Sequence, residues 1–450
     1  MTHSDTAIRF IRDLSWTEIP VNVQHQAKRC LLDTMGALLA GTATPVAGIM
    51  ADVARTQFGG NDATILVRGD RVSAAGAVLA NGFAQNGLDI DDGCRLVKGH
   101  PGACVLPVAL TAAEMMPTCT GADFLTALVV GYEIGIRAGL IRHATYAAYH
   151  SSGSWGALAG AAAAGRILDL DDTTLRQALG TAEYHAPIAP MMKGIVTPCM
   201  GKDSIGWGAM TAMLSVRMAQ NGFTGVIPLF DDAPKPEWIG GLGRDWNILN
   251  LYFKPYAACR WAQPAVDGAL KVKHENGLSV VDIRAIHIHT FAAAAALGTR
   301  PPSNTEEAQY NIAYPVAAAL IDGEVGPSQV LPPRIFDSDV RDLLGRVATE
   351  IEPDHEAAFP GKTYAEVVIA TATGERLSSG RMEPRWEPPG TLPSDAELEG
   401  KFDKLAAPIL GEARARELRK CIWRFEETER AAELVGLCRR SPVDGSDANA

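Results

Sequence analysis

The chain has 450 residues, of which 47% are hydrophobic and 21% charged, and its formal net charge is -11. This composition is ordinary for a globular protein and excludes a disordered or fibrous chain, while the length suggests two or three domains, of which we expect two. The acidic balance argues against nucleic acid and anionic membranes as partners, because binding phosphate groups requires clustered lysine and arginine.

The N-terminal stretch MTHSDTAIRFIRDLSW lacks the apolar region of a signal peptide, and no uncharged apolar run approaches the roughly 20 residues of a membrane-spanning helix. The eight cysteines form no CxxC pair, so neither a zinc site nor an iron–sulfur cluster is indicated. We therefore expect a cytoplasmic protein with free thiols.

From residue 25 to about residue 222 the sequence is rich in Ala, Leu, Met and Gly, and its apolar residues recur at three- and four-residue intervals. This period predicts helices that pack closely together. The small residues of SGSWGALAGAAAAGRILDL (152–170) predict a buried central helix, because they let other helices approach its backbone.

After about residue 264 the pattern becomes that of an α+β domain. Residues 279–292 alternate apolar and polar side chains, and KTYAEVVIATATGERLSSGRM (362–382) is typical of two strands joined by a turn at Thr373 and Gly374. The proline-rich segment 381–395 predicts a linker, beyond which helical patterning returns. We predict a mostly α fold, in which residues 1–265 and 396–450 form a large all-helical bundle domain and residues 266–395 form an inserted α+β lid domain.

Signatures of cofactor binding are missing from the sequence. No GxGxxG follows a predicted strand, GxSxG and HExxH do not occur, and GIVTPCMGKDS (194–204) has the wrong glycine spacing for a phosphate loop. His287 and His289 alternate on a predicted strand, and we interpret them as surface residues. We therefore expect no cofactor.

The stretch LDIDDGCRLVKGHPGACVLP (88–107) concentrates charge between two apolar segments. Asp89, Asp91 and Asp92 with His100 have the chemistry to bind a divalent cation, and helix capping or solvated charge is the alternative. No second carboxylate cluster of similar density occurs, so we expect no metal. The proline after His100 disfavours helical geometry and predicts that this histidine lies in a loop.

Two further segments carry candidate functional groups. YHSSGSWG (149–156) places His150 before a helix start, where it and the first N–H groups could face one anion, although a structural histidine is the alternative. YFKPYAACRWAQP (252–264) offers Lys254 and Arg260 near the predicted domain boundary, where cations would orient a substrate with two or three carboxylates. Together with Lys202, this set suits proton abstraction beside a carboxylate.

Several motifs, taken together, resemble the MmgE/PrpD family. They occur in order over residues 25–325 as CLLDTMGALLAG, NGFAQNGLDIDDG, GHPGACVLPVALTAAE, YHSSGSWGALAGAAAAGRIL, YFKPYAACR and AQYNIAYPVAAALIDG. The resemblance implies a helical domain built from both chain ends, an inserted α+β lid, a homodimer and an active site between the domains. It also implies cofactor-free chemistry beside a carboxylate, such as 2-methylcitrate dehydration, cis-aconitate decarboxylation or iminodisuccinate epimerisation.

The resemblance also assigns site residues. It places catalytic positions on Asp89, Asp91, His100, His150, Lys254 and Tyr314, and a substrate-carboxylate contact on Arg260. The sequence departs from the family pattern where Gly93 replaces a common Thr and Gln263 a common His, and we expect both residues to contact substrate. The segment TPCMGKDS replaces a T-K-P-hydrophobic-H run, which leaves Lys202 as the nearby candidate for the catalytic lysine.

We therefore predict a cofactor-independent lyase, specifically a dehydratase of a small di- or tricarboxylate such as a 2-methylcitrate-like acid. His100 and His150 would share proton abstraction and donation, while Asp89 or Asp91 orients a histidine. An epimerase of an iminodisuccinate-like dicarboxylate or a decarboxylase is the first alternative. A carboxylate-binding paralogue without activity is the second.

Overall fold

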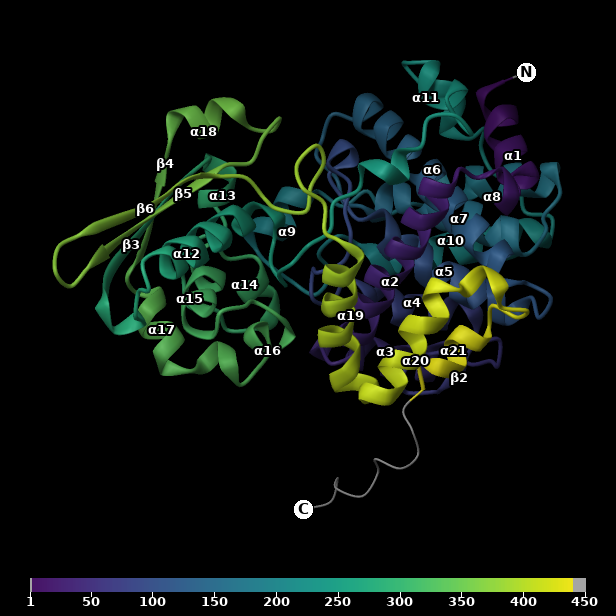
Figure 1. Ribbon diagram of the computed structural model, residues 1–450. Coiled ribbons are helices and arrows are strands. Elements are labelled where there is room, and N and C mark those ends of the chain that lie inside the picture. The colour runs from purple at the N-terminus through teal and green to yellow at the C-terminus, as the bar shows by residue number, and fades with distance from the viewer. Residues whose placement is uncertain (1, 440–450) are drawn as a thin grey trace.

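The computed structural model describes residues 2–439 as two parts packed side by side, a helical part on the right of Figure 1 and a smaller part with a sheet on the left. Helices dominate both parts, and the prediction of a mostly α fold with a smaller α+β part is confirmed. Residue 1 and residues 440–450, which we assigned to the helical domain, lie outside the described range.

The first 262 residues build most of the helical part, which also holds a two-residue ladder between β1 (Ala63–Thr64) and β2 (Arg71–Val72). Its helices are α1 (His3–Asp13), α2 (Val21–Gly41), α3 (Pro45–Gln57), α4 (Ala74–Gln85), α5 (Pro101–Met115), α6 (Gly121–Thr145), α7 (Gly153–Ile167), α8 (Asp172–Tyr184), α9 (Met191–Val196), α10 (Ile205–Gln220) and α11 (Glu237–Gly240).

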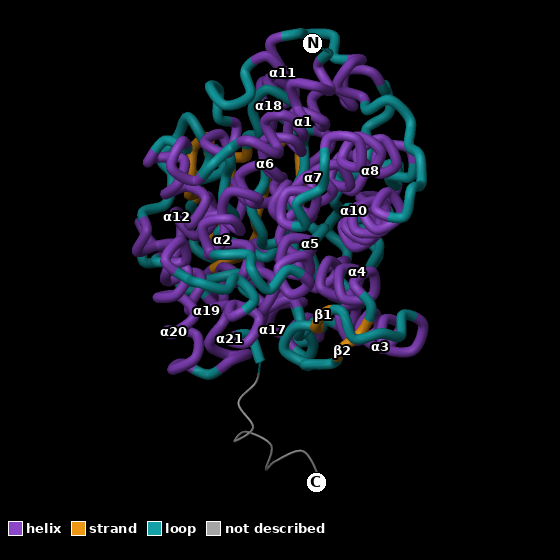
Figure 2. Tube along the Cα trace, turned by 90° about the vertical axis from the view of Figure 1, so that its right-hand side faces the viewer, coloured by secondary structure: helices purple, strands orange, loops and turns teal. Residues whose placement is uncertain are grey.

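The buried central helix predicted over residues 152–170 is α7. It packs against α5, α6, α8 and α10, and Figure 2 shows it among these helices. A Cβ at Gly156 would lie 2.2 Å from Cys104 Sγ, and one at Gly160 would lie 2.8 Å from the Cβ of Ala212. These glycines are therefore required by the close approach of α5 and α10 to the α7 backbone.

Helix α6 is long and apolar enough to cross a membrane by length and composition, but 94% of its most apolar window is buried inside the fold. It packs along α7 and contributes to the main hydrophobic core. A core helix of a globular domain passes the same test of length and hydropathy, and burial on all sides is typical of such a helix.

The α+β part is built around a four-stranded sheet in the order β4-β3-β5-β6. Strand β3 pairs parallel with β4 and antiparallel with β5, and the predicted hairpin is formed by β5 and β6 with Gly374 at a positive φ of 90°. The elements are α12 (Gln263–Glu275), β3 (Ile283–Thr290), α13 (Ala292–Ala295), α14 (Thr305–Gln309), α15 (Ala313–Asp322), α16 (Pro327–Val330), α17 (Ser338–Leu344), β4 (Val347–Ile351), α18 (Pro353–Ala358), β5 (Ala365–Thr371) and β6 (Arg376–Met382).

The last described helices return to the helical part. They are α19 (Asp395–Leu410), α20 (Glu412–Trp423) and α21 (Glu433–Leu437). Helix α19 packs along α2, and in Figure 1 it stands at the boundary between the two parts. Both ends of the chain therefore contribute to one hydrophobic core, while the sheet and its helices form a second one.

A buried ion pair fixes α19 to the rest of the helical part. Lys401 Nζ lies 2.5 Å from Asp33 Oδ1 on α2, and their side chains are 6% and 0% exposed. The same ammonium group donates a hydrogen bond of 2.7 Å to the carbonyl oxygen of Ile90, in the loop after α4. One cation from the C-terminal segment thus holds both a buried carboxylate and the acidic loop.

We expect Lys401→Met to destabilise the helical part by about 3–5 kcal/mol, because it leaves the Asp33 carboxylate buried without its partner. Urea unfolding followed by circular dichroism measures the effect. The matched control is Lys404→Met on the same helix, whose pair with Glu324 is largely exposed and should contribute about 0–1 kcal/mol. Equal midpoints for the two variants would contradict the expectation.

Candidate active site

The acidic loop between α4 and α5 is buried, although it carries three aspartates. Asp89, Asp91 and Asp92 are at most 2% exposed. Asp89 adopts a left-handed backbone conformation with φ 49°, which costs a residue with a Cβ about 1–2 kcal/mol. Asn86 donates a hydrogen bond of 3.0 Å to Asp91 Oδ1. The loop is thus held in one strained conformation by its surroundings.

His100 lies directly on these carboxylates and immediately precedes α5, in the loop that the sequence predicted. Its Nδ1 lies 2.8 Å from the carbonyl oxygen of Asp92 and 3.0 Å from Asp91 Oδ2, while its Nε2 lies 3.4 Å from Asp89 Oδ1. Its backbone N–H donates to Ser152 Oγ. The imidazole is therefore oriented on both ring nitrogens.

These contacts determine the charge of His100. Burial alone would lower the pKa of the imidazole, but the carboxylates of Asp91, Asp203 and Asp89 outweigh it and raise the pKa to about 10. At neutral pH the ring is an imidazolium ion. His100 is therefore suited to donate a proton rather than to abstract one.

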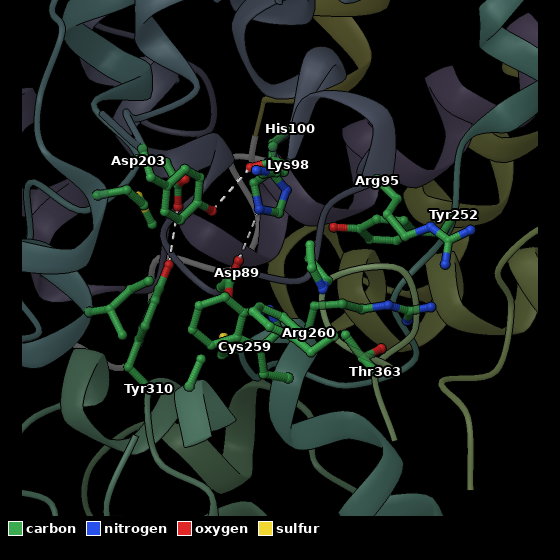
Figure 3. A pocket seen from close by; sticks show the side chains of 18 of the residues that line it. Asp89, Arg95, Lys98, His100, Asp203, Tyr252, Cys259, Arg260, Tyr310 and Thr363 are labelled. Carbon is green, nitrogen blue, oxygen red and sulfur yellow. Dashed lines mark hydrogen bonds and ion pairs between the residues drawn. The ribbon is translucent and has the colours of Figure 1, made fainter. Parts of the chain in front are cut away.

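A cavity of about 480 Å³ opens above His100, between the helical part and the α+β part. Its lining residues come from both parts: Asp89, Arg95, Lys98, Gly99, His100, Tyr149, Met191, Met192, Ile195, Asp203, Tyr252, Lys254, Cys259, Arg260, Trp261, Ala293, Tyr310, Phe359, Pro360, Gly361, Thr363 and Glu387. Figure 3 shows His100, Asp89, Asp203 and Tyr310 together on one side, with Arg95, Arg260, Tyr252 and Thr363 on the other.

A second proton-carrying pair faces His100 and was not predicted. The hydroxyl of Tyr310 donates to Asp203 Oδ2 at 3.1 Å, and Ser152 Oγ donates to the other oxygen at 3.4 Å. Burial raises the pKa of Asp203, which makes this carboxylate a stronger base than an exposed one. Both residues are close in sequence to predicted ones, since Asp203 follows Lys202, and Tyr310 at the end of α14 precedes Tyr314 in α15 by four residues.

The two predicted lysines occupy different environments. Lys254 lines the cavity, and its Nζ lies 2.8 Å from Asp89 Oδ1. Lys202 lies outside the cavity wall, where it donates to Gln309 Oε1 at 2.6 Å and to the carbonyl oxygen of Gly87 at 3.3 Å. Burial lowers the pKa of Lys202. Of the two, Lys254 is placed to touch a bound molecule.

His150 and Tyr314 do not line the cavity. The ring of His150 stacks on His143 with centroids 4.2 Å apart, and its Nδ1 lies 2.7 Å from Ser154 Oγ. Burial and His143 lower the pKa of His150 to about 4, so its ring is neutral. The Tyr314 hydroxyl donates to the carbonyl oxygen of Gln329 within the α+β part. The structure therefore brings together Asp89, Asp91 and His100 but leaves these two residues behind the wall.

The two departures from the family pattern have structural causes. A Cβ at Gly93 would lie 2.3 Å from the hydroxyl and ring of Tyr252, so that ring fills the space of a side chain at this position. Gln263 is buried and donates to the carbonyl oxygen of Ala258 at 3.0 Å, while its Oε1 accepts from Arg260 Nη1 at 3.0 Å. Neither residue lines the cavity, but each supports a residue that does.

One cluster in the cavity has ligand atoms close enough for a cation. Oxygen and nitrogen atoms of Asp89, His100 and Asp203 all lie within 4.8 Å of one another. A metal ion would have to displace the proton that the same carboxylates stabilise on His100, and it would meet the ammonium group of Lys254. The electrostatics of the cluster thus favour a protonated imidazole over a divalent cation.

Comparison with known proteins gives two matches in chain order, to the MmgE/PrpD N-terminal domain over residues 6–235 and the MmgE/PrpD C-terminal domain over residues 256–427. Cis-aconitate decarboxylase of Homo sapiens is 28% identical, over 93% of this chain and 90% of that protein. A cis-aconitate decarboxylase-like protein of Aspergillus oryzae is 25% identical over 95% of each chain. Cis-aconitate decarboxylase of Aspergillus terreus is 22% identical, over 96% of this chain and 95% of the relative.

The charge of His100 can be tested by NMR titration of protein with labelled histidine. We expect its ring to stay protonated through neutrality and to titrate near pH 10, and Asp91→Asn to lower this pKa. The pKa of His100 is higher in the folded protein than the value of about 6.5 in the unfolded chain, so the charged ring stabilises the fold. This contribution is fully present below pH 6.5 and is lost as the pH rises through about 10. Asp70→Asn, a change at a surface turn, serves as control. Titration of wild-type His100 near pH 6.5 would contradict the expectation.

Proposed function

Since the chain belongs to the MmgE/PrpD family, whose two domains it contains in order, we propose that it is a lyase that acts without a cofactor beside a carboxylate of its substrate. The observation that carries the proposal is the imidazolium of His100, held by buried carboxylates at one end of the cavity. A preorganised proton donor next to a cationic lysine suits reactions in which negative charge develops on a carboxylic acid.

The cations of the cavity are suited to bind substrate carboxylates. Lys254 lies beside His100, and Lys98 has no carboxylate within ion-pair distance among residues 2–439. The turn Arg95–Val97 folds back through backbone bonds between Cys94 and Gly99, so that Lys98 reaches the cavity wall. A substrate carboxylate bound by these ammonium groups would lie next to the acid His100.

Dehydration would use both Asp203 and His100, which lie at the same end of the cavity. The Asp203 carboxylate, whose basicity is raised by burial, would take the proton from the carbon beside the substrate carboxylate. His100 would give its proton to the leaving hydroxyl group, so that a carbon–carbon double bond and water form. Tyr310 would hold Asp203 in place, and the proton that Asp203 has taken up would pass back to His100 after the product leaves, which restores both groups. A carboxylate oxygen of Asp203 and a ring nitrogen of His100 lie within 4.8 Å of each other, so both proton transfers can take place on one substrate.

Decarboxylation is the second candidate, because two of the similar proteins are named cis-aconitate decarboxylase and a third cis-aconitate decarboxylase-like. In that reaction the carbon–carboxylate bond breaks, carbon dioxide leaves, and His100 protonates the carbanion that remains. Decarboxylation therefore requires His100 as the acid but does not require Asp203 as a base. Mass analysis of products from hydroxylated and unsaturated tricarboxylates separates the two reactions, since only decarboxylation shortens the carbon skeleton.

We expect His100→Gln to lower turnover by about 10²–10⁴-fold with the fold intact, the usual effect of removing a general acid. His150→Gln should lower turnover less, because the ring of His150 lies behind the cavity wall. His287→Gln on β3 is the surface control and should leave turnover unchanged. A chelator should not change the wild-type rate. Turnover of His100→Gln at the wild-type rate, or solvent deuterium exchange without elimination or loss of carbon dioxide, would contradict the assignment.

We also propose that the protein forms a homodimer through the segment that runs from the end of α8 to the loop after α10. Most of its exposed large apolar side chains lie on this stretch, namely Tyr184, Ile188, Met192, Val196, Met200, Trp207, Leu214, Phe223, Val226 and Ile227. Helices α8 and α10 pack side by side, as Figure 2 shows. Exposed large apolar side chains that gather in one segment of a fold are typical of a protein interface.

Light scattering after gel filtration should therefore give twice the chain mass, and Trp207→Glu should lower it to that of one chain. Leu96→Glu, a change at an exposed leucine elsewhere, is the matched control and should leave the mass unchanged. A wild-type protein that elutes as a single chain at micromolar concentration would contradict the proposal.

A further inference from the structure

The end of the cavity away from His100 contains a carboxylate supplied by the protein itself. Glu387 lies in the segment that leads from the sheet back to α19, and its side chain is only 11% exposed. Its Oε2 lies 2.6 Å from Arg260 Nη2, and its Oε1 lies 3.3 Å from Arg95 Nε. One carboxylate therefore pairs with both arginines of this end.

Both guanidinium groups are occupied by further partners. Arg260 lies over the ring of Tyr252 at 4.4 Å from the centroid, and it donates to Gln263 Oε1 and to the carbonyl oxygen of Arg385. Arg95 donates to the carbonyl oxygen of Gly361 at 2.7 Å. The preceding residue, Trp386, has φ 64°, so Glu387 is presented by a strained backbone that the fold holds in place.

Two aromatic rings lie close to these arginines. Trp261 follows Arg260 in the chain and packs edge-on against Phe359, with centroids 5.8 Å apart, and both rings line the cavity. The volume of about 480 Å³ lies in the range of pockets for drug-sized ligands, roughly 300–1,000 Å³. A tricarboxylic acid of the aconitate type, bound at His100 and Lys254, would leave these apolar side chains facing water.

We propose that Glu387 is a specificity-determining residue, because its carboxylate takes the position between Arg95 and Arg260 that a further carboxylate of the substrate would need. The substrate then carries an apolar chain or ring at this end, in contact with Trp261 and Phe359. The inference rests on the proposed function, since it assumes that a substrate carboxylate binds near His100. It extends the proposed function by specifying an apolar substituent at the end of the cavity that contains Glu387.

The proposal follows from charge and packing together. A second carboxylate brought against Glu387 would face a like charge at short distance and would find both guanidinium groups already paired, which disfavours binding strongly. An apolar group instead removes the surfaces of Trp261 and Phe359 from water, and burial of apolar area is favourable. The arginines then serve to position Glu387 and close the wall between the two parts.

Two acids that differ only in one group test the inference by isothermal titration calorimetry. Tricarballylate and benzylsuccinate are the same substituted succinate, with a carboxylate in one and a phenyl ring in the other, and neither has a leaving group. Wild-type protein should bind benzylsuccinate at least about tenfold more tightly. Glu387→Gln should bind tricarballylate about tenfold more tightly than wild type does, because it frees charge on both arginines.

Glu383→Gln is the matched control on the same returning segment, since Glu383 pairs with Lys362 at the surface and should leave both affinities unchanged. Tighter wild-type binding of tricarballylate, or an unchanged ratio in Glu387→Gln, would overturn the inference. The wild-type ratio decides alone if Glu387→Gln does not fold. If neither acid binds wild-type protein, the proposed carboxylate site fails as well, whereas equal binding of both overturns only this inference.

Discussion

The acidic loop after α4 can be buried only because cationic side chains from distant parts of the chain surround it. Transfer of an unpaired carboxylate from water into a protein interior is costly, and this buried loop holds two that pair with cations, Asp89 and Asp91. Burial raises the pKa of Asp92 to about 8, so this third side chain is protonated at pH 7. His100 supplies one positive charge from the start of the following helix, Lys254 supplies a second from the junction with the α+β part, and Lys401 on α19 makes a third contact. The site therefore depends on chain segments more than 300 residues apart in sequence.

Features set by local periodicity could be predicted from the sequence. The helical pattern predicted both ends of α7 to within a few residues. The alternating pattern predicted β3, and the turn residues predicted the hairpin of β5 and β6. The proline after His100 correctly predicted a loop conformation at that histidine. The acidic run and Lys254 were identified because charge is rare in apolar surroundings, and the fold does bring them together.

Features that arise from long-range packing could not be predicted in the same way. Asp203, Tyr310 and Glu387 come from three separate segments, and no local pattern marks any of them as a cavity residue. For Asp203 and Tyr310 the correct motif was found but the wrong member was chosen as the one in contact with the site, because the direction of a side chain depends on the exact start of the next helix. Glu387 lies in a proline-rich linker, where composition predicts only an end to regular structure.

The contact between Gly93 and Tyr252 makes the residue type allowed at one position depend on the residue type at the other. The backbones of the two residues exchange hydrogen bonds, and the ring occupies the volume of a side chain at position 93. A lineage that carries a threonine there needs a smaller residue opposite it, and a lineage that carries the tyrosine can keep only glycine. A change at either position therefore requires a matching change at the other, although 158 residues lie between them in the sequence.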